Sequence, residues 1–186
     1  MYGMVNQAVR GMVRDRYGEA VWTRIHTAAE APESFSPMEP YDDAITYSLV
    51  GAASRELALP AETILKAFGE YWVAHIATVH YERIMNNSGV SFTDFLGNLD
   101  HMHQRIRVTF PNYDPPSFRV KPIDASTLQV DYYSRRVGLL PFVEGLLQGL
   151  AVHFSVTLGI EHVDRASHRL PCQRMIVRHS PARKSD

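Results

Sequence analysis

The sequence lacks the features of a secreted or membrane protein. Its 186 residues include one cysteine, Cys172. A single thiol excludes an internal disulfide and favours a reducing compartment. No apolar run approaches the roughly 20 residues that cross a bilayer as a helix, and residues 1–6 have neither the charged nor the apolar region of a signal peptide. We therefore expect a soluble, cytoplasmic protein without a membrane segment.

An excess of charge of either sign is also missing. The 19 lysines and arginines nearly balance the 20 aspartates and glutamates, and the formal net charge is -1. Such a balance provides no long-range attraction to nucleic acid or to an anionic membrane surface, so we expect neither as a partner. The one basic cluster, residues 178–184, is interpreted as a frayed and solvated chain end.

The sequence contains no signature of the common catalytic and metal sites. Gly-x-Ser-x-Gly, a glycine-rich phosphate loop and His-Glu-x-x-His are all absent. His162, His168 and Cys172 have side chains of the type that bind zinc. The chain has only one thiol, however, and no Cys-x-x-Cys spacing, so we reject a structural zinc site.

The order of the predicted elements indicates an α+β fold. Apolar side chains first recur at helical spacing, in residues 5–13, 21–29, 45–53, 64–76 and 92–110. The pattern then changes to the alternation of a hairpin, followed by one helix and two closing strands, in residues 118–121, 128–132, 139–150, 154–163 and 172–178. Helices followed by an antiparallel sheet with one packed helix form an α+β arrangement.

The same order predicts the domain organisation. We expect a single domain over residues 1–186, with an N-terminal helical subdomain over about residues 1–60. A second subdomain, over about residues 61–180, then contains a four-stranded antiparallel sheet and its packed helix. Residues 181–186 are expected to form a tail.

One predicted helix carries a histidine on its apolar side. His103 lies four residues after Leu99 and three before Ile106, within the apolar stripe of residues 92–110. His101 lies ~200° around the helix axis, on the polar side. An imidazole in an apolar slot can bind haem iron. Taken alone, the same spacing is more common for a histidine that is simply part of a core.

Tyr132, Ser134 and Arg136 share one face if their segment is a strand, because strand side chains alternate with period two. A phenol, a hydroxyl and a guanidinium on one face can bind carboxylates. Taken alone, these residues are also compatible with a solvated strand face. The next turn leads into a strongly apolar helix, so this strand end borders the interior. Together with His103, a carboxylate site is what a protein needs to hold haem.

Several short segments occur along the chain in a characteristic order. They are residues 1–3, 50–54, 68–72, 98–103, 115–116, 132–136 and 145–150. In this order they resemble the haem-nitric oxide/oxygen binding (H-NOX) family, which comprises the haem domain of soluble guanylate cyclase and its stand-alone bacterial relatives. The resemblance covers nearly the whole chain, and it implies that the second subdomain binds haem b (iron protoporphyrin IX).

The resemblance implies a role for each residue of the haem site. His103 ends the Asn-Leu-Asp-x-apolar-His run and is implied to be the proximal ligand of the iron. Tyr132, Ser134 and Arg136 match the family's Tyr-x-Ser-x-Arg motif, which binds the haem propionates. Pro116 matches the second proline of a Pro-Pro pair, which presses on the porphyrin and distorts it.

The gas-binding side also follows from the resemblance. Val5, Trp72 and Phe142 are expected to line the distal pocket, and oxygen-binding members supply a tyrosine from the helix that here carries Phe142. Phenylalanine offers no hydrogen-bond donor to bound oxygen. The indole N–H of Trp72 is a donor, but we interpret this side chain as filling space. The expectation is a five-coordinate ferrous haem that binds nitric oxide and carbon monoxide and excludes oxygen.

The resemblance further implies a sensor and not an enzyme. A change at the iron–His103 bond would signal to a separate protein, a histidine kinase or a cyclic-di-GMP enzyme, because we expect no output domain on this chain. Two alternatives stay open. A peroxidase-like haem enzyme needs a distal acid–base group, for which His75 is the nearest candidate, and a haem-free module would bind an apolar carboxylate through Arg136.

Overall fold

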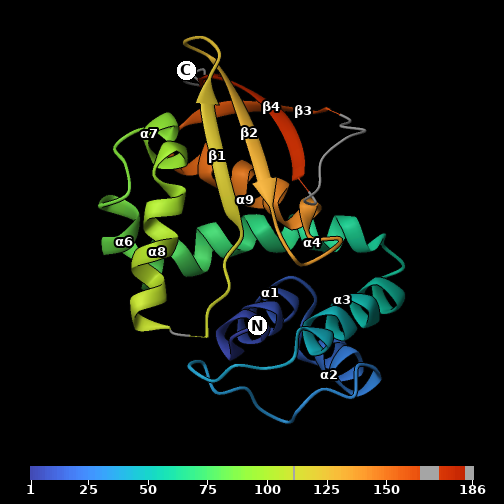
Figure 1. Cartoon of the computed structure of the whole chain (residues 1–186). Helices are drawn as coiled ribbons and strands as arrows, with labels where there is room; N and C mark the ends of the chain where they lie inside the picture. Colours follow the sequence, from blue (N-terminus) through green and yellow to red (C-terminus); the bar gives the residue numbers. More distant parts are fainter. Residues whose placement is uncertain (111, 164–171, 183–186) are drawn as a thin grey trace.

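Three N-terminal helices form one layer of the molecule. The computed structural model describes residues 1–110, 112–163 and 172–182, and Figure 1 shows α1 (Gly3–Tyr17), α2 (Glu19–Ala28) and α3 (Asp43–Leu57) below α4. Their apolar stripes face one another, because side chains three and four positions apart share a helix face. The fully buried side chains of this N-terminal core include Val9, Met12, Val13, Ile25 and Leu49.

A long helical segment crosses the middle of the fold. It begins with α4 (Ala61–Tyr71) after Pro60, widens into the π-helix η1 (Trp72–Ala77), and continues as α5 (Thr78–His80) and α6 (Glu82–Asn86). The helical stripe was predicted, but the widening at Trp72 was not. A π-turn inserts one residue into the helical repeat and is frequent at functional sites. Trp72 packs against both hydrophobic cores.

Helix α9 (Leu140–His153) lies directly against α4 because glycines line the contact. A methyl group on Gly149 would come within 2.8 Å of the Val73 Cβ atom, and one on Gly69 would overlap the Phe142 carbonyl oxygen. Larger side chains would hold the two helices apart. Gly145 and Gly149, four residues apart, therefore lie on the face of α9 that approaches α4 and η1.

The second half of the chain forms a four-stranded antiparallel sheet. Its strands are β1 (Ser117–Pro122), β2 (Thr127–Tyr133), β3 (Val156–Val163) and β4 (Cys172–Pro181), in the spatial order β1-β2-β4-β3. Helix α9 packs against this sheet, and buried side chains from both contribute to the second hydrophobic core. The predicted α+β fold, with a hairpin and two closing strands, is confirmed.

The interpretation of residues 178–184 as a frayed end is wrong for its first part. Arg178 pairs with Thr127 and Gly159, and His179 continues the same ladder of β4. Backbone pairing on both sides therefore holds this segment in the sheet. Residues 183–186 lie outside the described part of the chain.

The single helix expected over residues 92–110 is divided into two. Helix α7 (Phe92–Gly97) ends before Asn98, and α8 (Leu99–Thr109) starts after it. Glycine disfavours helix continuation, and the Asn98 side-chain amide donates to the Ser88 carbonyl oxygen at 3.0 Å. The predicted apolar stripe is buried at Leu99 but only half-buried at Ile106, because little covers the far end of α8.

The boundary predicted near residue 60 stays a prediction. Ile64, Leu65 and Phe68 of α4 belong to the N-terminal core, although α4 also packs against α9. Among the described residues, no helix combines the length and the hydropathy required to cross a bilayer.

Candidate functional site

His103 carries a buried ring nitrogen without a hydrogen-bond partner. Its Nδ1 atom is enclosed, and no partner for it is found among the described residues. Such an orphaned polar atom costs about 1–3 kcal/mol in a protein interior, so its presence points to a ligand. His101 is exposed on the same helix, which confirms that the two histidines face different surroundings.

The surroundings of His103 favour the neutral imidazole. Burial lowers the pKa of the ring, whereas the Asp100 carboxylate and the Pro116 carbonyl oxygen act in the opposite direction without reversing the shift. Metal binding requires a deprotonated ring nitrogen. The site therefore holds His103 in the protonation state that an iron ligand needs. It also brings the predicted residue Pro116 close to the ring.

Asp100 connects the start of α8 to β1. Its two carboxylate oxygens accept hydrogen bonds from the Phe118 backbone N–H at 2.7 Å and from the Ser117 hydroxyl at 2.9 Å. The Phe118 ring then lies 5.9 Å from the His103 ring and 5.3 Å from the Tyr132 ring, centroid to centroid. These contacts fix the helix that carries His103 relative to the strand pair that carries Tyr132.

Tyr132 is buried on β2, opposite Phe118 in the strand register. Burial raises the pKa of its phenol, while the Ser134 hydroxyl and the Arg136 guanidinium oppose that shift. The phenol therefore remains a neutral hydrogen-bond donor. The opposing influences also indicate that the three predicted residues lie within interaction distance of one another.

The condition under which Tyr132, Ser134 and Arg136 would share one strand face is not met. Strand β2 ends at Tyr133, and the next residues form a bend. The Arg136 backbone N–H donates to the Ser134 hydroxyl oxygen at 3.0 Å, a local turn that competes with strand continuation. A turn, and not the alternation of a strand, brings the three side chains together.

Arg136 is half-buried and partly neutralised by the N-terminal helices. Its Nε atom lies 2.6 Å from Asp43 Oδ2, and its Nη1 atom donates to the Asp114 carbonyl oxygen at 2.6 Å. The other Asp43 oxygen, Oδ1, accepts a hydrogen bond from the Met1 amino group at 2.6 Å. Arginine has five N–H donors, and no hydrogen bond from Nη2 is found among the described residues, so Arg136 retains capacity for another carboxylate.

Asp43 is held in its charged form by this arrangement. Burial raises the pKa of its carboxyl, but the hydrogen bonds from the Met1 amino group and from Arg136 outweigh that effect, and the net pKa is lowered. Asp43 belongs to none of the motifs that predict the haem site. Its pairing with Arg136 joins positions 93 residues apart, for which the sequence pattern carries no signal.

The three predicted distal residues all pack against the N-terminal core. Phe142 stacks on Phe68 with ring centroids 4.9 Å apart, and Phe68 meets Trp72 edge to face at 6.2 Å. Val5 is half-buried nearby on α1. Within the described part of the chain, the Trp72 indole N–H makes no hydrogen bond, which is consistent with a space-filling role.

His75 faces away from these residues. Its side chain is exposed and stacks on Tyr71 with ring centroids 4.3 Å apart. Tyr71 in turn donates to Asp15 at 2.7 Å. A histidine on the outer surface cannot act as the distal acid–base group beside Trp72. The position of His75 therefore disfavours the peroxidase-like alternative.

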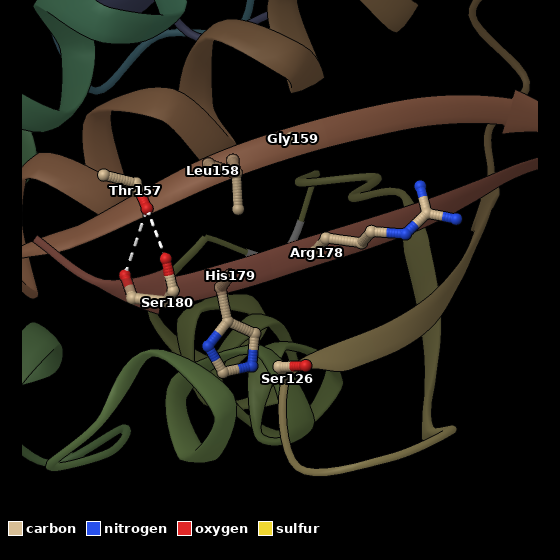
Figure 2. A pocket seen from close by; sticks show the side chains of 7 residues that line it. All are labelled: Ser126, Thr157, Leu158, Gly159, Arg178, His179 and Ser180. Atoms are coloured by element: carbon tan, nitrogen blue, oxygen red, sulfur yellow. Dashed lines mark hydrogen bonds between the residues drawn. The ribbon is translucent and has the colours of Figure 1, made fainter.

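A separate pocket of about 390 Å³ lies at the other end of the sheet (Figure 2). Thr157 and Ser180 bond to each other there at 2.7 Å, and Figure 2 shows the Arg178 guanidinium turned away from that pair. Arg178 is paired with Glu161 at 2.8 Å. None of the predicted site residues lines this pocket, and the polar groups named here satisfy one another.

The residues considered for zinc do not form a common site in the described chain. His162 lies 2.9 Å from a Glu144 oxygen, while Cys172 starts β4 opposite Tyr133. His168 lies outside the described residues. No group of three or more potential metal-binding His, Cys, Asp or Glu side chains occurs among residues 1–110, 112–163 and 172–182.

Sequence comparison relates most of the chain to one family. The family model described as Haem-NO-binding matches residues 2–162. Soluble guanylate cyclase gcy-31 of Caenorhabditis elegans is 24% identical over 180 residues, which cover 96% of this chain and 26% of that protein. Soluble guanylate cyclase gcy-33 of the same organism is 31% identical over 163 residues, covering 87% and 17%. The chain thus spans about a quarter or less of these relatives.

Solved structures share the fold over the whole chain. An H-NOX protein from S. oneidensis in the Fe(II) ligation state has a TM-score of 0.86 at 21% identity, with 99% of this chain and 98% of that chain covered. The same organism's H-NOX protein in the Fe(II)NO state has a TM-score of 0.84 at 22% identity, with coverage of 97% and 99%. At these identities the similarity concerns the fold.

Proposed function

Because the chain belongs to the Haem-NO-binding (H-NOX) family of haem-binding gas-sensor domains, we propose that it senses nitric oxide with a bound haem b. His103 is the iron ligand in this proposal. Tyr132, Ser134 and Arg136 would bind the propionates, and Pro116 would press on the porphyrin. Nitric oxide and carbon monoxide are the proposed ligands, and the proposed location is the cytoplasm.

The observation that carries the proposal is the orphaned Nδ1 atom of His103. A neutral imidazole with one enclosed and unpartnered nitrogen suits a metal ligand better than a core position, since the buried polar atoms of a core histidine would be hydrogen-bonded. The residues for the propionates fit as well. Hydrogen bonds to Asp43 and Asp114 hold Arg136 in place and leave its Nη2 donors for another acceptor. The buried Tyr132 phenol remains protonated.

The distal side supports selectivity against oxygen. We propose that Val5, Trp72 and Phe142 line the gas pocket. Phe142 has no hydrogen-bond donor, and its ring is occupied by stacking on Phe68. Bound oxygen gains from a donor, whereas nitric oxide binds tightly without one. If a stable oxygen complex forms when the ferrous protein is exposed to air, the exclusion of oxygen is wrong.

Signalling would start at His103. Haem held by His103 would supply an iron centre that can bind a diatomic gas, and His103 would be the protein group that responds to that binding. A released His103 would let α8 shift relative to β1, to which the first turn of α8 is tied by the hydrogen bonds of Asp100. The gas can move this equilibrium only because the bond differs between the two states.

The Arg136–Asp43 pair would carry the change to α3 and the N-terminal helices. We propose a separate protein, a histidine kinase or a cyclic-di-GMP enzyme, as the receiver. The relatives named above are guanylate cyclases, so activity of a longer protein would belong to a part outside the matched domain. The chain itself is proposed to be a sensor without catalytic activity.

Replacement of His103 tests the proposal. The purified wild type is expected to show a Soret band that shifts when nitric oxide is added. His103→Gly is expected to take up haem only with added imidazole and to lose the response to nitric oxide. His101→Gly is the matched control, because His101 is exposed on the same helix, and it should behave as the wild type. Haem binding with an unchanged spectrum in His103→Gly would refute the assignment.

The absorption spectrum also decides between the proposal and a haem-free module. A purified protein that has no Soret band and takes up no added haem would favour binding of an apolar carboxylate at Arg136.

A further inference from the structure

Tyr113 lies against the ring of His103 but belongs to none of the motifs identified in the sequence. It is half-buried in the loop between α8 and β1. Its ring meets the imidazole edge to face, with centroids 6.1 Å apart and an interplanar angle of 75°. Phe118 is the second aromatic neighbour, at 5.9 Å and 41°. His103 thus contacts two aromatic rings that approach it at different angles.

The two rings belong to different parts of the fold. The Tyr113 backbone N–H donates to the Phe110 carbonyl oxygen at 2.9 Å, in a turn that directly follows α8. Tyr113 is therefore tied to the helix that carries His103. Phe118 is part of β1 and is held by the strand register and by Asp100. Tyr113 is thus linked to the end of α8 and Phe118 to the sheet, so the two ring contacts of His103 are held by different elements.

The orientation of a metal-binding imidazole is usually fixed by a hydrogen bond. The ring nitrogen that does not bind the metal donates this bond to a carboxylate, a carbonyl or water. For His103, the nearby group of this kind is the Pro116 carbonyl oxygen. Packing by the neighbouring rings of Tyr113 and Phe118 adds a second restraint on the imidazole. Edge-to-face contact is a preferred geometry between aromatic rings, and Tyr113 makes it.

We propose that Tyr113 is a positioning residue that restrains rotation of the His103 imidazole and so sets the strength of its bond to haem iron. This inference rests on the proposed function, in which His103 is the iron ligand. The aromatic ring carries the effect, because the Tyr113 hydroxyl makes no hydrogen bond within the described part of the chain. Removal of the hydroxyl should therefore matter little, and removal of the ring should matter more.

Resonance Raman spectra of the ferrous, gas-free protein test the inference through the iron–imidazole stretching band. We expect Tyr113→Phe to keep the band of the wild type. Tyr113→Leu should shift the band to lower wavenumber and broaden it, because a ring free to rotate samples weaker iron bonds. Tyr133→Leu is the matched control. Its ring packs under the Arg119 guanidinium at 5.2 Å, away from His103, and the band should stay unchanged.

Each outcome has one meaning. Identical bands in Tyr113→Leu and the wild type overturn the role of Tyr113 but leave the proposed function standing. An equal shift in Tyr113→Phe and Tyr113→Leu has the same consequence, since the hydroxyl would then be responsible. A wild type that binds haem without an iron–imidazole band overturns the proposed function and the inference with it. If Tyr113→Leu fails to fold by circular dichroism, Tyr113→Met, with a flexible apolar side chain, takes its place under the same criteria.

Discussion

The contact between α4 and α9 can be tested by adding one methyl group to Gly145. A Cβ atom on this residue would overlap the Lys66 carbonyl oxygen, lie 2.8 Å from the Lys66 carbonyl carbon and lie 3.0 Å from the Gly69 Cα atom. These neighbours are backbone atoms, which cannot rotate away as a side chain does. Gly145→Ala therefore forces α4 and α9 apart, and with them Trp72, which directly follows α4, and Phe142 of α9.

Two opposing effects determine the free energy of unfolding of Gly145→Ala. Alanine in place of glycine inside a helix stabilises by about 1 kcal/mol. Forcing extra volume into a packed contact costs about 1–3 kcal/mol, and the upper value applies because the obstacle is backbone. The net expectation is a loss of about 2 kcal/mol.

Gly51→Ala is the matched control for this substitution. Gly51 also lies inside a helix, but a Cβ atom there would meet nothing closer than the flexible Arg55 side chain at 3.6 Å. This variant should be stabilised by about 1 kcal/mol, which places the two variants about 3 kcal/mol apart.

Urea unfolding followed by circular dichroism measures this difference. For a protein of this size, a loss of about 2 kcal/mol corresponds to a fall of roughly 4–8 °C in Tm. The haem absorption should change in Gly145→Ala and not in Gly51→Ala, because only the first substitution displaces Phe142. Equal stabilisation of both variants would refute the close contact of the two helices at Gly145.

Three further predictions concern single contacts of the site. The pKa of the Asp43 carboxyl is lowered in the folded state, so its contribution to stability is present above its unfolded pKa of about 4 and is lost as pH falls through the folded value. Asp43→Asn should therefore make the free energy of unfolding in urea less dependent on pH between neutral and acid conditions. An unchanged pH dependence would contradict this. Asp100→Ala removes the acceptor of the Phe118 N–H and should lower the free energy of unfolding by about 1.5–3 kcal/mol, whereas a stability equal to that of the wild type would mean that Asp100 does not tie α8 to β1. Phe142→Tyr supplies a hydrogen-bond donor to the distal side, so it should allow a longer-lived oxygen complex, measured as the decay of its absorption bands in air; a decay as fast as in the wild type would count against Phe142 as the distal residue.

The secondary structure was predictable where it depends on near neighbours in the chain. The alternation of β1 and β2 and the stripe of α9 follow from patterns repeated every two or 3.6 residues. The break at Asn98 was missed because Phe92, Leu99 and Ile106 keep a helical spacing across it. A contact with the Ser88 carbonyl oxygen, which precedes α7, decides that break.

The candidate site was only partly predictable for the same reason. The opposite orientations of His101 and His103 follow from the helical repeat alone. The composition of the site around His103 does not, because Tyr113, Phe118 and the Pro116 carbonyl oxygen reach the ring from a loop and a strand that follow the helix.

The sequence by itself determined the order of helices and strands, the inward position of His103 and the family to which the motifs point. Only the tertiary structure decided that Ser134 and Arg136 lie in a turn beyond β2, and that Arg136 pairs with Asp43 of α3. Periodicity describes how a segment faces its surroundings. Periodicity contains no information on which distant charged residue will pair with Arg136, since that depends on how the two halves of the chain pack.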